Sequence, residues 1–338
     1  MTDTPFVSVV VPAYNAQPTI RHTIQSLVSQ TYPGEYEIIV VDDGSTDRTS
    51  EIVRSFSEVK YIRQPNAGPA AARNRGAADS KGEVILFTDS DCAAHKDWIE
   101  RIVGGFSSDE IAAVCGSYGI ANPENILAGC IHDEIIFRHR RIMSCYPQAF
   151  GSYNVGIRRS VFWRVGGFDE SYRRASGEDN DLSYKILKTG GRIFFAKNAL
   201  VDHYHTTQLE KYLREQFSHG FWRVRIYWRH PDMVKGDGYT FWKDMVEVPL
   251  VGLTCLAVLF SMTGSLRPYY PILCIVLPFW FLEIYFSTVI CRNIYAKFYF
   301  SFVMLLRAFV RSFGLSTGIL DHLIKIFKKL SEKKPIKP

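Results

Sequence analysis

The chain has 338 residues, of which 47% are hydrophobic, 14% aromatic and 22% charged. This composition supplies enough apolar side chains for a large core, and it excludes disordered and low-complexity proteins. Two apolar stretches after residue 245 are longer and more continuous than the helices of globular proteins. We therefore expect a protein that is attached to a membrane.

The net charge of +6 is unevenly distributed along the chain. Residues 292–338 carry ten Lys or Arg and two acids, which leaves about −2 for the rest. A basic tail beside apolar helices favours anionic lipid headgroups, because no motif that reads RNA or DNA accompanies it. Membrane lipids are therefore the expected partner and nucleic acid is not, with a solvated charged terminus as the alternative.

The seven cysteines are odd in number and show no C-x-x-C spacing, so neither a zinc site nor a disulfide framework is expected. The N-terminus has neither a basic start nor an apolar signal core. We expect the first domain to lie on the cytosolic side.

The first hundred residues alternate between two patterns. Short β-branched runs such as Phe6–Val11 and Glu37–Val41 precede stretches with helical spacing, such as Ile20–Val28. This alternation predicts βαβ units and a parallel sheet that is covered by helices on both faces. Ligands of such sheets bind beyond the carboxyl ends of the strands. Neither a G-x-G-x-x-G fingerprint nor a P-loop is present.

Carboxylates follow two of the predicted strands. Asp42 and Asp43 follow the second strand, and Asp89 and Asp91 follow the fourth. Several like charges in close proximity repel unless a divalent cation neutralises them, and hard oxygen ligands favour Mg²⁺ or Mn²⁺. The alternative is that both segments are turns that cap the next helix.

Four motifs in order give a specific resemblance. They are VSVVVPAYN over 7–15, IVVDDGSTD over 39–47, NAGPAAARN over 66–74 and FTDSD over 87–91. With these motifs the chain resembles the family 2 glycosyltransferases from about Val7 to Trp222. The resemblance implies an α/β, Rossmann-like A-type glycosyltransferase fold and inverting hexosyl transfer from a nucleotide-diphosphate sugar.

The resemblance also implies roles for individual residues. It places Tyr14 against the base and Asp42 at the base edge, gives Asp91 the metal that bridges the diphosphate, and lets Asp89 reach the ribose or the metal. The residues assigned to the nucleotide are Pro12, Tyr14, Asn15, Asp42, Gly68, Arg73 and Asp89, and those assigned to the metal are Asp91, Asp89 and His203. A metal there would stabilise the negative charge of the leaving diphosphate.

The acceptor half resembles the family in an N-x-G segment near Asn154 and in the E-D-x-D-L helix start at 178–182. By the family pattern Asp179 is the general base and Glu178 holds neighbouring groups or the acceptor, with Asp181 tentatively on the acceptor side. Two alternatives remain. In the first, the three acids only stabilise the helix N-terminus. In the second, Asp179 only orients a phosphate acceptor.

His203 and His205 follow an apparent strand at 192–196, and their spacing places both on one face. No further ligand has a spacing that would complete a zinc site. The family has a histidine near this point that approaches the metal or the diphosphate, and His203 is the candidate. The alternative is a partly buried, hydrogen-bonded histidine.

The segment 216–223 is similar to the Q-x-x-R-W segment of processive polysaccharide synthases, with two departures. His219 stands where Arg is usual, and Gly220 stands where Trp is usual. These departures favour transfer of a single sugar. Gln216 and His219 are tentative acceptor or diphosphate residues.

Two apolar spans, about 245–266 and 269–290, are each long enough to cross a bilayer, and Arg267-Pro268 breaks them into a hairpin. We expect the third stretch, about 298–323, to be an amphipathic helix on the cytosolic surface, with a third crossing as the alternative. Glu283 in the second span is expected to pair with Arg307 or Arg311, and this polar seam would guide a lipid-phosphate acceptor. The alternative is that Glu283 faces a watery crevice near the surface.

The predicted organisation is a catalytic domain at 1–235, a membrane region at 236–323 and a basic tail at 324–338. Within the catalytic domain the nucleotide half spans about 1–115 and the acceptor half about 116–235. The predicted function is a multi-pass glycosyltransferase of the cytoplasmic membrane that uses a lipid-linked or envelope glycan acceptor. UDP-sugars are the preferred donors from family frequency alone. The alternatives are a sugar nucleotidyltransferase and a non-catalytic membrane scaffold.

Overall fold

The computed structural model describes residues 4–141, 143–174, 176–232, 242–262, 267, 272–291 and 293–332. The described chain forms two compact units, one that ends at His205 and one that begins at Thr206. The sequence placed the end of the catalytic domain at about residue 235, and that boundary stays a prediction.

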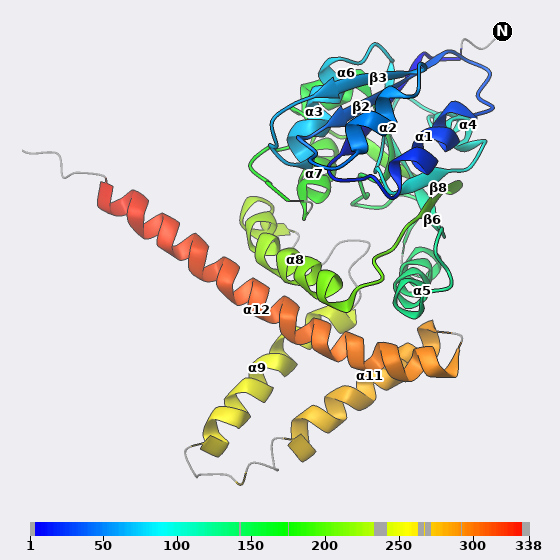
Figure 1. Cartoon of the computed structure of the whole chain (residues 1–338). Helices are drawn as coiled ribbons and strands as arrows, with labels where there is room; N and C mark the ends of the chain where they lie inside the picture. Colours follow the sequence, from blue (N-terminus) through cyan, green and yellow to red (C-terminus); the bar gives the residue numbers. More distant parts are fainter. Residues whose placement is uncertain are drawn as a thin grey trace, which may run out of the picture. The chain divides into compact units, whose positions relative to one another are not determined.

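The first unit contains one eight-stranded sheet and seven helices within its described residues (Figure 1). The strands are β1 (Val7–Ala13), β2 (Tyr36–Asp42), β3 (Val59–Arg63), β4 (Val84–Thr88), β5 (Cys92–Ala94), β6 (Ile111–Ile120), β7 (Asn154–Arg158) and β8 (Arg192–His203). The helices are α1 (Ile20–Val28), α2 (Thr49–Arg54), α3 (Pro69–Ala78), α4 (Trp98–Gly104), α5 (Ile126–Arg141), α6 (Arg159–Arg164) and α7 (Glu178–Lys188).

The strands lie in the order β3-β2-β1-β4-β7-β6-β8-β5. Strands β1 to β4 pair in parallel, which confirms the predicted βαβ half. Strand β7 is antiparallel to both β4 and β6, and β5 is antiparallel to β8. The sheet is therefore mixed, and its antiparallel pairs all involve strands that follow Asp89-Ser90-Asp91.

Alternate residues of β1 face opposite sides of the sheet. Val9 and Val11 pack in one apolar cluster with Ile24 of α1, whereas Val10 packs in another cluster with Ala70 of α3. Both faces of the central strands are thus covered by helices. The polar segments that follow the carboxyl ends of β1, β2 and β4 consequently meet at one edge of the sheet.

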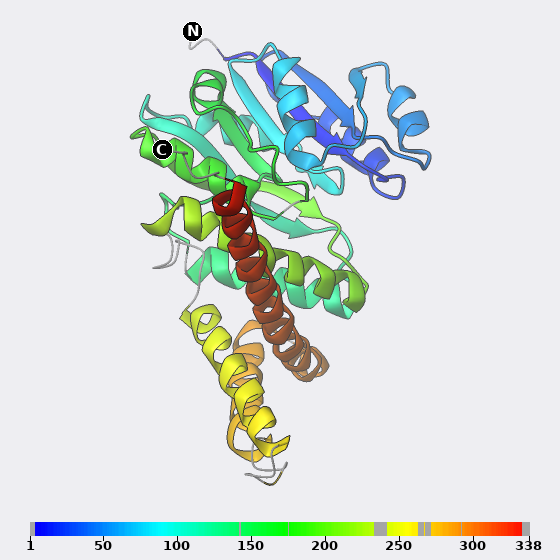
Figure 2. The ribbon, with the colours of Figure 1, turned by 90° about the vertical axis from the view of Figure 1, so that its left-hand side faces the viewer.

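The second unit is helical throughout its described elements. These are α8 (Leu209–Arg229), α9 (Trp242–Met262), a π-helical turn (Ile272–Val276), α11 (Leu277–Ile290) and α12 (Ile294–Glu332). Helix α12 is one continuous helix of 39 residues that packs along α8 (Figures 1 and 2). The two helices approach closely because glycines line their contact. A Cβ atom at Gly220 would lie 2.2 Å from the carbonyl oxygen of Arg311, and one at Gly314 would lie 2.2 Å from that of Phe217.

Helix α9 and the 294–328 part of α12 are long and apolar enough to cross a membrane, whereas the apolar helix at 274–290 is shorter. The expected first span matches α9, with residues 263–266 outside the described part. The expected second span is represented by the π-helical turn and α11, and residues 268–271 of the predicted hairpin lie outside the described part. The third stretch extends beyond its predicted limits at both ends, and residues 333–338 of the tail are outside the described part. Its interfacial placement stays a prediction.

Candidate active site

Two loops at the carboxyl edge of the sheet are tied together by Asn15. This residue has a left-handed backbone, with φ at 48°. Its N–H donates to Ser45 Oγ at 3.0 Å, and its Oδ1 accepts from the Thr46 N–H at 2.8 Å. The neighbouring Tyr14 side chain remains 53% exposed. An exposed ring beside a braced loop is available to stack on a planar base.

Asp42 lies at the end of β2 with its side chain fully buried. Its Oδ1 accepts from the Ser45 N–H at 2.8 Å, and its Oδ2 accepts from the Tyr61 hydroxyl at 2.6 Å. Both oxygens therefore have partners within the loop and β3. The predicted bond from Asp42 to the base edge stays a prediction.

Asp43 holds the loop that begins α3, a function that the sequence did not reveal. One carboxylate oxygen accepts from Gln64 Nε2 at 2.7 Å and from the Ala67 N–H at 2.9 Å, and the other accepts from the Gly68 N–H at 2.8 Å. Gly68 has φ at 96°, and a Cβ there would lie 2.8 Å from the carbonyl oxygen of Arg173. Only glycine fits this position without strain. The signal in the sequence was the second acid of the Asp-Asp pair.

Arg73 joins the two predicted halves of the site. Its guanidinium donates to Asp89 Oδ1 at 2.7 Å and to Glu178 Oε1 at 3.0 Å, and Arg73 is only 2% exposed. Burial alone lowers the pKa of Arg73, but the attraction of Asp89 and Glu178 outweighs this effect and gives a net rise. The carboxylates that follow β4 therefore lie beside those that begin α7.

Asp179 begins α7 beside Glu178 and is partly exposed. Its Oδ1 accepts from the Asn180 N–H at 2.8 Å. Desolvation, together with repulsion from Glu178, raises the pKa of Asp179 to about 7. A carboxyl that titrates near neutral pH is suited to accept a proton. Asp181, by contrast, is buried and pairs with Lys185 Nζ at 3.0 Å.

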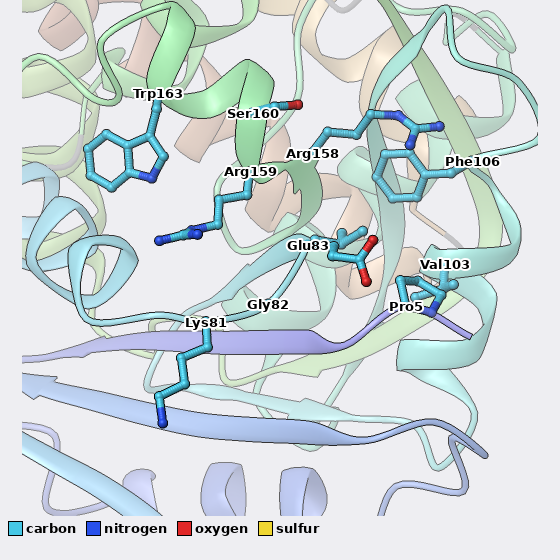
Figure 3. A pocket seen from close by; sticks show the side chains of 11 residues that line it. Pro5, Lys81, Gly82, Glu83, Val103, Phe106, Arg158, Arg159, Ser160 and Trp163 are labelled. Carbon is cyan, nitrogen blue, oxygen red and sulfur yellow. The ribbon is translucent and has the colours of Figure 1, made fainter. Parts of the chain in front are cut away.

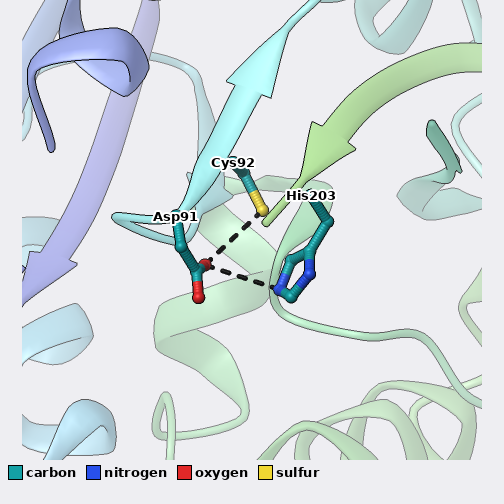
Figure 4. A group of neighbouring side chains, drawn as sticks. All are labelled: Asp91, Cys92 and His203. Carbon is teal, nitrogen blue, oxygen red and sulfur yellow. Dashed lines mark hydrogen bonds and ion pairs between the residues drawn. The ribbon is translucent and has the colours of Figure 1, made fainter. Parts of the chain in front are cut away.

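Asp91, Cys92 and His203 form the group of potential metal ligands that the described residues contain (Figure 4). Their ligand atoms lie within 4.8 Å of one another, and Asp91 Oδ1 is 3.5 Å from His203 Nε2. Burial raises the pKa of the Cys92 thiol well above its usual value, so Cys92 remains a neutral thiol. An accessible carboxylate opposite an imidazole nitrogen fits a divalent cation such as Mn²⁺.

Asn122 holds the backbone of His205, the histidine that contacts His203. The His205 N–H donates to Asn122 Oδ1 at 3.1 Å, and its carbonyl accepts from Asn122 Nδ2 at 2.7 Å. The Nδ1 atoms of His203 and His205 lie 3.1 Å apart. Burial lowers the pKa of His205 to about 2, so the ring stays neutral. The two histidines do lie together, as their spacing predicted.

A cavity of about 680 Å³ lies at the opposite edge of the sheet (Figure 3). Lys81 and Glu83 line it just before β4 begins, and Arg159 and Trp163 line it from α6. None of the predicted site residues contributes to its walls. This cavity is therefore separate from the carboxylates that follow β4.

The remaining candidates belong to the second unit. Arg307 contacts the Tyr212 hydroxyl at 3.4 Å and Glu247 at 3.9 Å, and it is buried. The Arg311 side chain is 31% exposed, and its Nε donates to Gln216 Oε1 at 2.7 Å. His219 is exposed on α8.

Glu283 is buried, and its ion pair is with Lys243 of α9 at 2.7 Å. The partners expected from the sequence were Arg307 and Arg311 on the next helix, but α9 supplies the cation that pairs with Glu283. The Lys243 that pairs with Glu283 also pairs with Glu247, which links the same cluster to Arg307. Gly220, the second departure from the Q-x-x-R-W segment, has a packing reason in its contact with α12.

Sequence comparisons identify the family of this chain. Residues 8–166 match the family model described as Glycosyl transferase family 2, and residues 132–209 match one described as the N-terminal domain of galactosyltransferase. Glycosyltransferase AglE of Haloferax volcanii is 31% identical over 234 residues, which cover 67% of this chain and 76% of that protein. The chain belongs to glycosyl transferase family 2.

Other relatives are also glycosyltransferases. The probable glycosyltransferase YdaM of Bacillus subtilis is 35% identical over 216 residues, or 59% of this chain and 51% of that protein. The pre-mycofactocin glycosyltransferase of Mycobacterium tuberculosis is 29% identical over 273 residues, or 76% of this chain and 56% of that protein. This family 2 chain thus spans only about half the length of these two relatives.

Among solved structures, a mannosyltransferase from Pyrobaculum calidifontis in complex with GDP-Man and Mn²⁺ has a TM-score of 0.51. The likeness covers 99% of this family 2 chain and 82% of that protein at 18% identity. It shows a shared fold, and the predicted A-type glycosyltransferase fold is confirmed.

Proposed function

We propose that this family 2 chain is a membrane-bound, metal-dependent, inverting glycosyltransferase. It transfers a sugar from a nucleotide-diphosphate donor to a lipid-linked or envelope glycan acceptor. Family membership and the named relatives support glycosyltransferase activity. The observation that carries the finer proposal is the Arg73 bridge, because it brings Asp89 beside the pair Glu178-Asp179.

On the donor side, the exposed ring of Tyr14 stacks on the base, and Asp89 faces the ribose or the metal. Asp91 and His203 would hold Mn²⁺ or Mg²⁺. When bound, the ion supplies positive charge that stabilises the leaving nucleoside diphosphate. The 3.5 Å distance between Asp91 Oδ1 and His203 Nε2 supports this assignment, because a carboxylate oxygen and an imidazole nitrogen are both ligands of divalent cations.

On the acceptor side, Asp179 takes the proton of the attacking hydroxyl, and the sugar is transferred with inversion at its anomeric carbon. A pKa near 7 supports this role, because the carboxylate is then both available and basic at neutral pH. Glu178 acts as a fixed charge, since its oxygens accept from Arg73 and from the Ser176 N–H. With a phosphate acceptor, Asp179 would only orient the nucleophile.

A lipid-linked acceptor is supported by the exposed apolar side chains of the second unit. Leu256, Leu259, Phe260 and Met262 of α9 are each more than half exposed, a surface that suits hydrocarbon. Of the two candidate arginines, Arg311 is the better contact for an acceptor phosphate because its side chain is partly exposed. Lys325 and Lys328 near the end of α12 favour a cytosolic location for that end.

The test is a transfer assay on the full chain in detergent with labelled UDP-, GDP- and dTDP-sugars, a membrane lipid extract and Mn²⁺. UDP-sugars are tried first. We expect one donor to label the lipid fraction and EDTA to prevent this labelling. The product should have the inverted anomeric configuration. Asp179→Asn is the matched variant without the base. In a parallel assay with a nucleoside triphosphate and a sugar 1-phosphate, release of pyrophosphate would indicate a sugar nucleotidyltransferase instead. No turnover in either assay would favour a scaffold.

A further inference from the structure

The contact between His203 and His205 restricts where the imidazole protons lie. Their Nδ1 atoms are 3.1 Å apart, and their ring centroids are separated by 4.6 Å. Two ring nitrogens at this distance share a single proton, because two N–H groups facing each other would repel and two lone pairs would leave the contact without a hydrogen bond. One histidine therefore donates and the other accepts.

His205 cannot easily turn away from this contact. Its backbone is held on both sides by the Asn122 amide, and the residue is only 5% exposed. The rings of Tyr118 and His132 pack around it, with centroids 5.7 and 5.8 Å from its own. The nitrogen that faces His203 therefore has a fixed position.

The protonation of Nε2, the other ring nitrogen of His203, decides whether this residue can bind a metal. Nε2 lies 3.5 Å from Asp91 Oδ1. If Nε2 carries the proton, it can donate to Asp91 but cannot bind a metal. If Nδ1 carries the proton and donates it to His205, the Nε2 lone pair faces the Asp91 carboxylate. Two electron-rich groups in that arrangement are stabilised by a cation between them.

We propose that His205 is a positioning residue for the metal site: by accepting the Nδ1–H of His203, it keeps the Nε2 lone pair directed at the cation that Asp91 shares. The inference rests on the metal assignment in the proposed function. Its basis is the general rule that the partner of one imidazole nitrogen sets the tautomer and orientation of a ligating histidine.

The first test is Mn²⁺ affinity, measured by electron paramagnetic resonance titration of the full chain in detergent without donor. We compare the wild type with His205→Phe, which keeps a ring but no acceptor, and with His205→Gln, which supplies an amide oxygen. His205→Phe should raise the Kd for Mn²⁺ about 10- to 100-fold, the usual effect of losing such a partner. A third variant, His205→Asn, places its side-chain oxygen at the same distance from Cα as Nδ1 and should stay within about threefold of the wild type, whereas the longer His205→Gln need not.

The second test uses only the wild-type protein, so its result does not depend on whether a variant folds. In the Mg²⁺-loaded wild type with ¹⁵N-labelled histidine, the spectrum should show His203 protonated at Nδ1 and not at Nε2. Protonation at Nε2 in that sample would overturn the inference, as would wild-type Mn²⁺ affinity in His205→Phe or equal losses in the Phe and Asn variants. If the wild type binds neither ion, the metal assignment itself fails, and this inference fails with it.

Discussion

Arg73 places one positive charge between two carboxylates that approach from different parts of the chain. Asp89 follows β4 and Glu178 begins α7, so the side chain connects segments separated by about 90 residues. Removing one partner of a buried ion pair leaves uncompensated charge in a poorly solvated place. The arrangement of the candidate site and the stability of the first unit therefore depend on the contacts of one residue.

We predict that Arg73→Met lowers the free energy of unfolding by about 3–5 kcal/mol, because Asp89 and Glu178 lose their shared counter-charge. The control is Arg75→Met on the same helix, whose exposed pair with Asp79 should contribute less than about 1 kcal/mol. Urea unfolding of both variants measures the difference. Equal losses would mean that the Arg73 bridge is energetically unimportant.

Asp179→Asn should leave donor binding intact and lower turnover by about 10²-fold or more, as the loss of a general base would. In the wild type, turnover should rise with pH around 7, since Asp179 must be ionised to accept a proton. The folded pKa is raised, so ionised Asp179 destabilises the fold, and stability falls as pH rises through the range up to about 7. The variant should therefore gain in melting temperature relative to the wild type between pH 5 and pH 8. A flat pH profile would exclude Asp179 as the base.

The residues proposed to act on a ligand stand in sequence motifs, whereas the hydrogen bonds of residues that hold other residues could not be predicted. Asp91 and Asp179 belong to motifs whose residue types and positions predict their roles, and those roles stay predictions. Asp43 and Asn122 act through backbone groups far along the chain, 24 or more residues from them. No local sequence pattern predicts such a hydrogen bond.

At the scale of elements, the α8–α12 contact depends on glycine. We predict that Gly314→Ala destabilises the second unit, because its Cβ would lie 2.2 Å from the carbonyl oxygen of Phe217. Gly252→Ala on α9 is the matched control, since nothing lies within 4 Å of its Cβ and alanine favours a helix by about 1 kcal/mol. Thermal unfolding in detergent should show a lower melting temperature for Gly314→Ala alone. A fall of the same size in both would contradict the packing argument.

The alternation of strands and helices was predictable from periodicity, but the later strands were not. The strand expected at 192–196 continues as β8 to His203 through exposed Lys197 and Asn198, polar residues that would ordinarily end a strand pattern. Its length is set by pairing with β6 and β5, which a local pattern does not contain. In the same way, α12 begins before and ends after its apolar stretch, and it packs on α11 as well as on α8.

At the scale of the whole molecule, an acidic-to-neutral catalytic part is joined to apolar helices and a basic end. We predict that the chain stays in the membrane fraction after alkaline carbonate washing and requires detergent for release. The physical reason is the exposed apolar surface of α9, which would otherwise face water. Release by carbonate or by high salt would instead indicate a peripheral attachment through the basic residues.

We propose that the carboxyl edge of the sheet, where Asp89 and Asp91 follow β4, binds a nucleotide-diphosphate sugar together with a divalent cation. Calorimetric titration of the full chain with UDP-, GDP- and dTDP-sugars, with Mn²⁺ and then with EDTA, tests it most directly. We predict that at least one donor binds only with the ion and that Asp91→Ala abolishes this binding, while the exposed control Asp97→Ala retains it. Unchanged donor affinity in Asp91→Ala, or equal affinity in EDTA, would show that neither Asp91 nor a divalent cation takes part in donor binding.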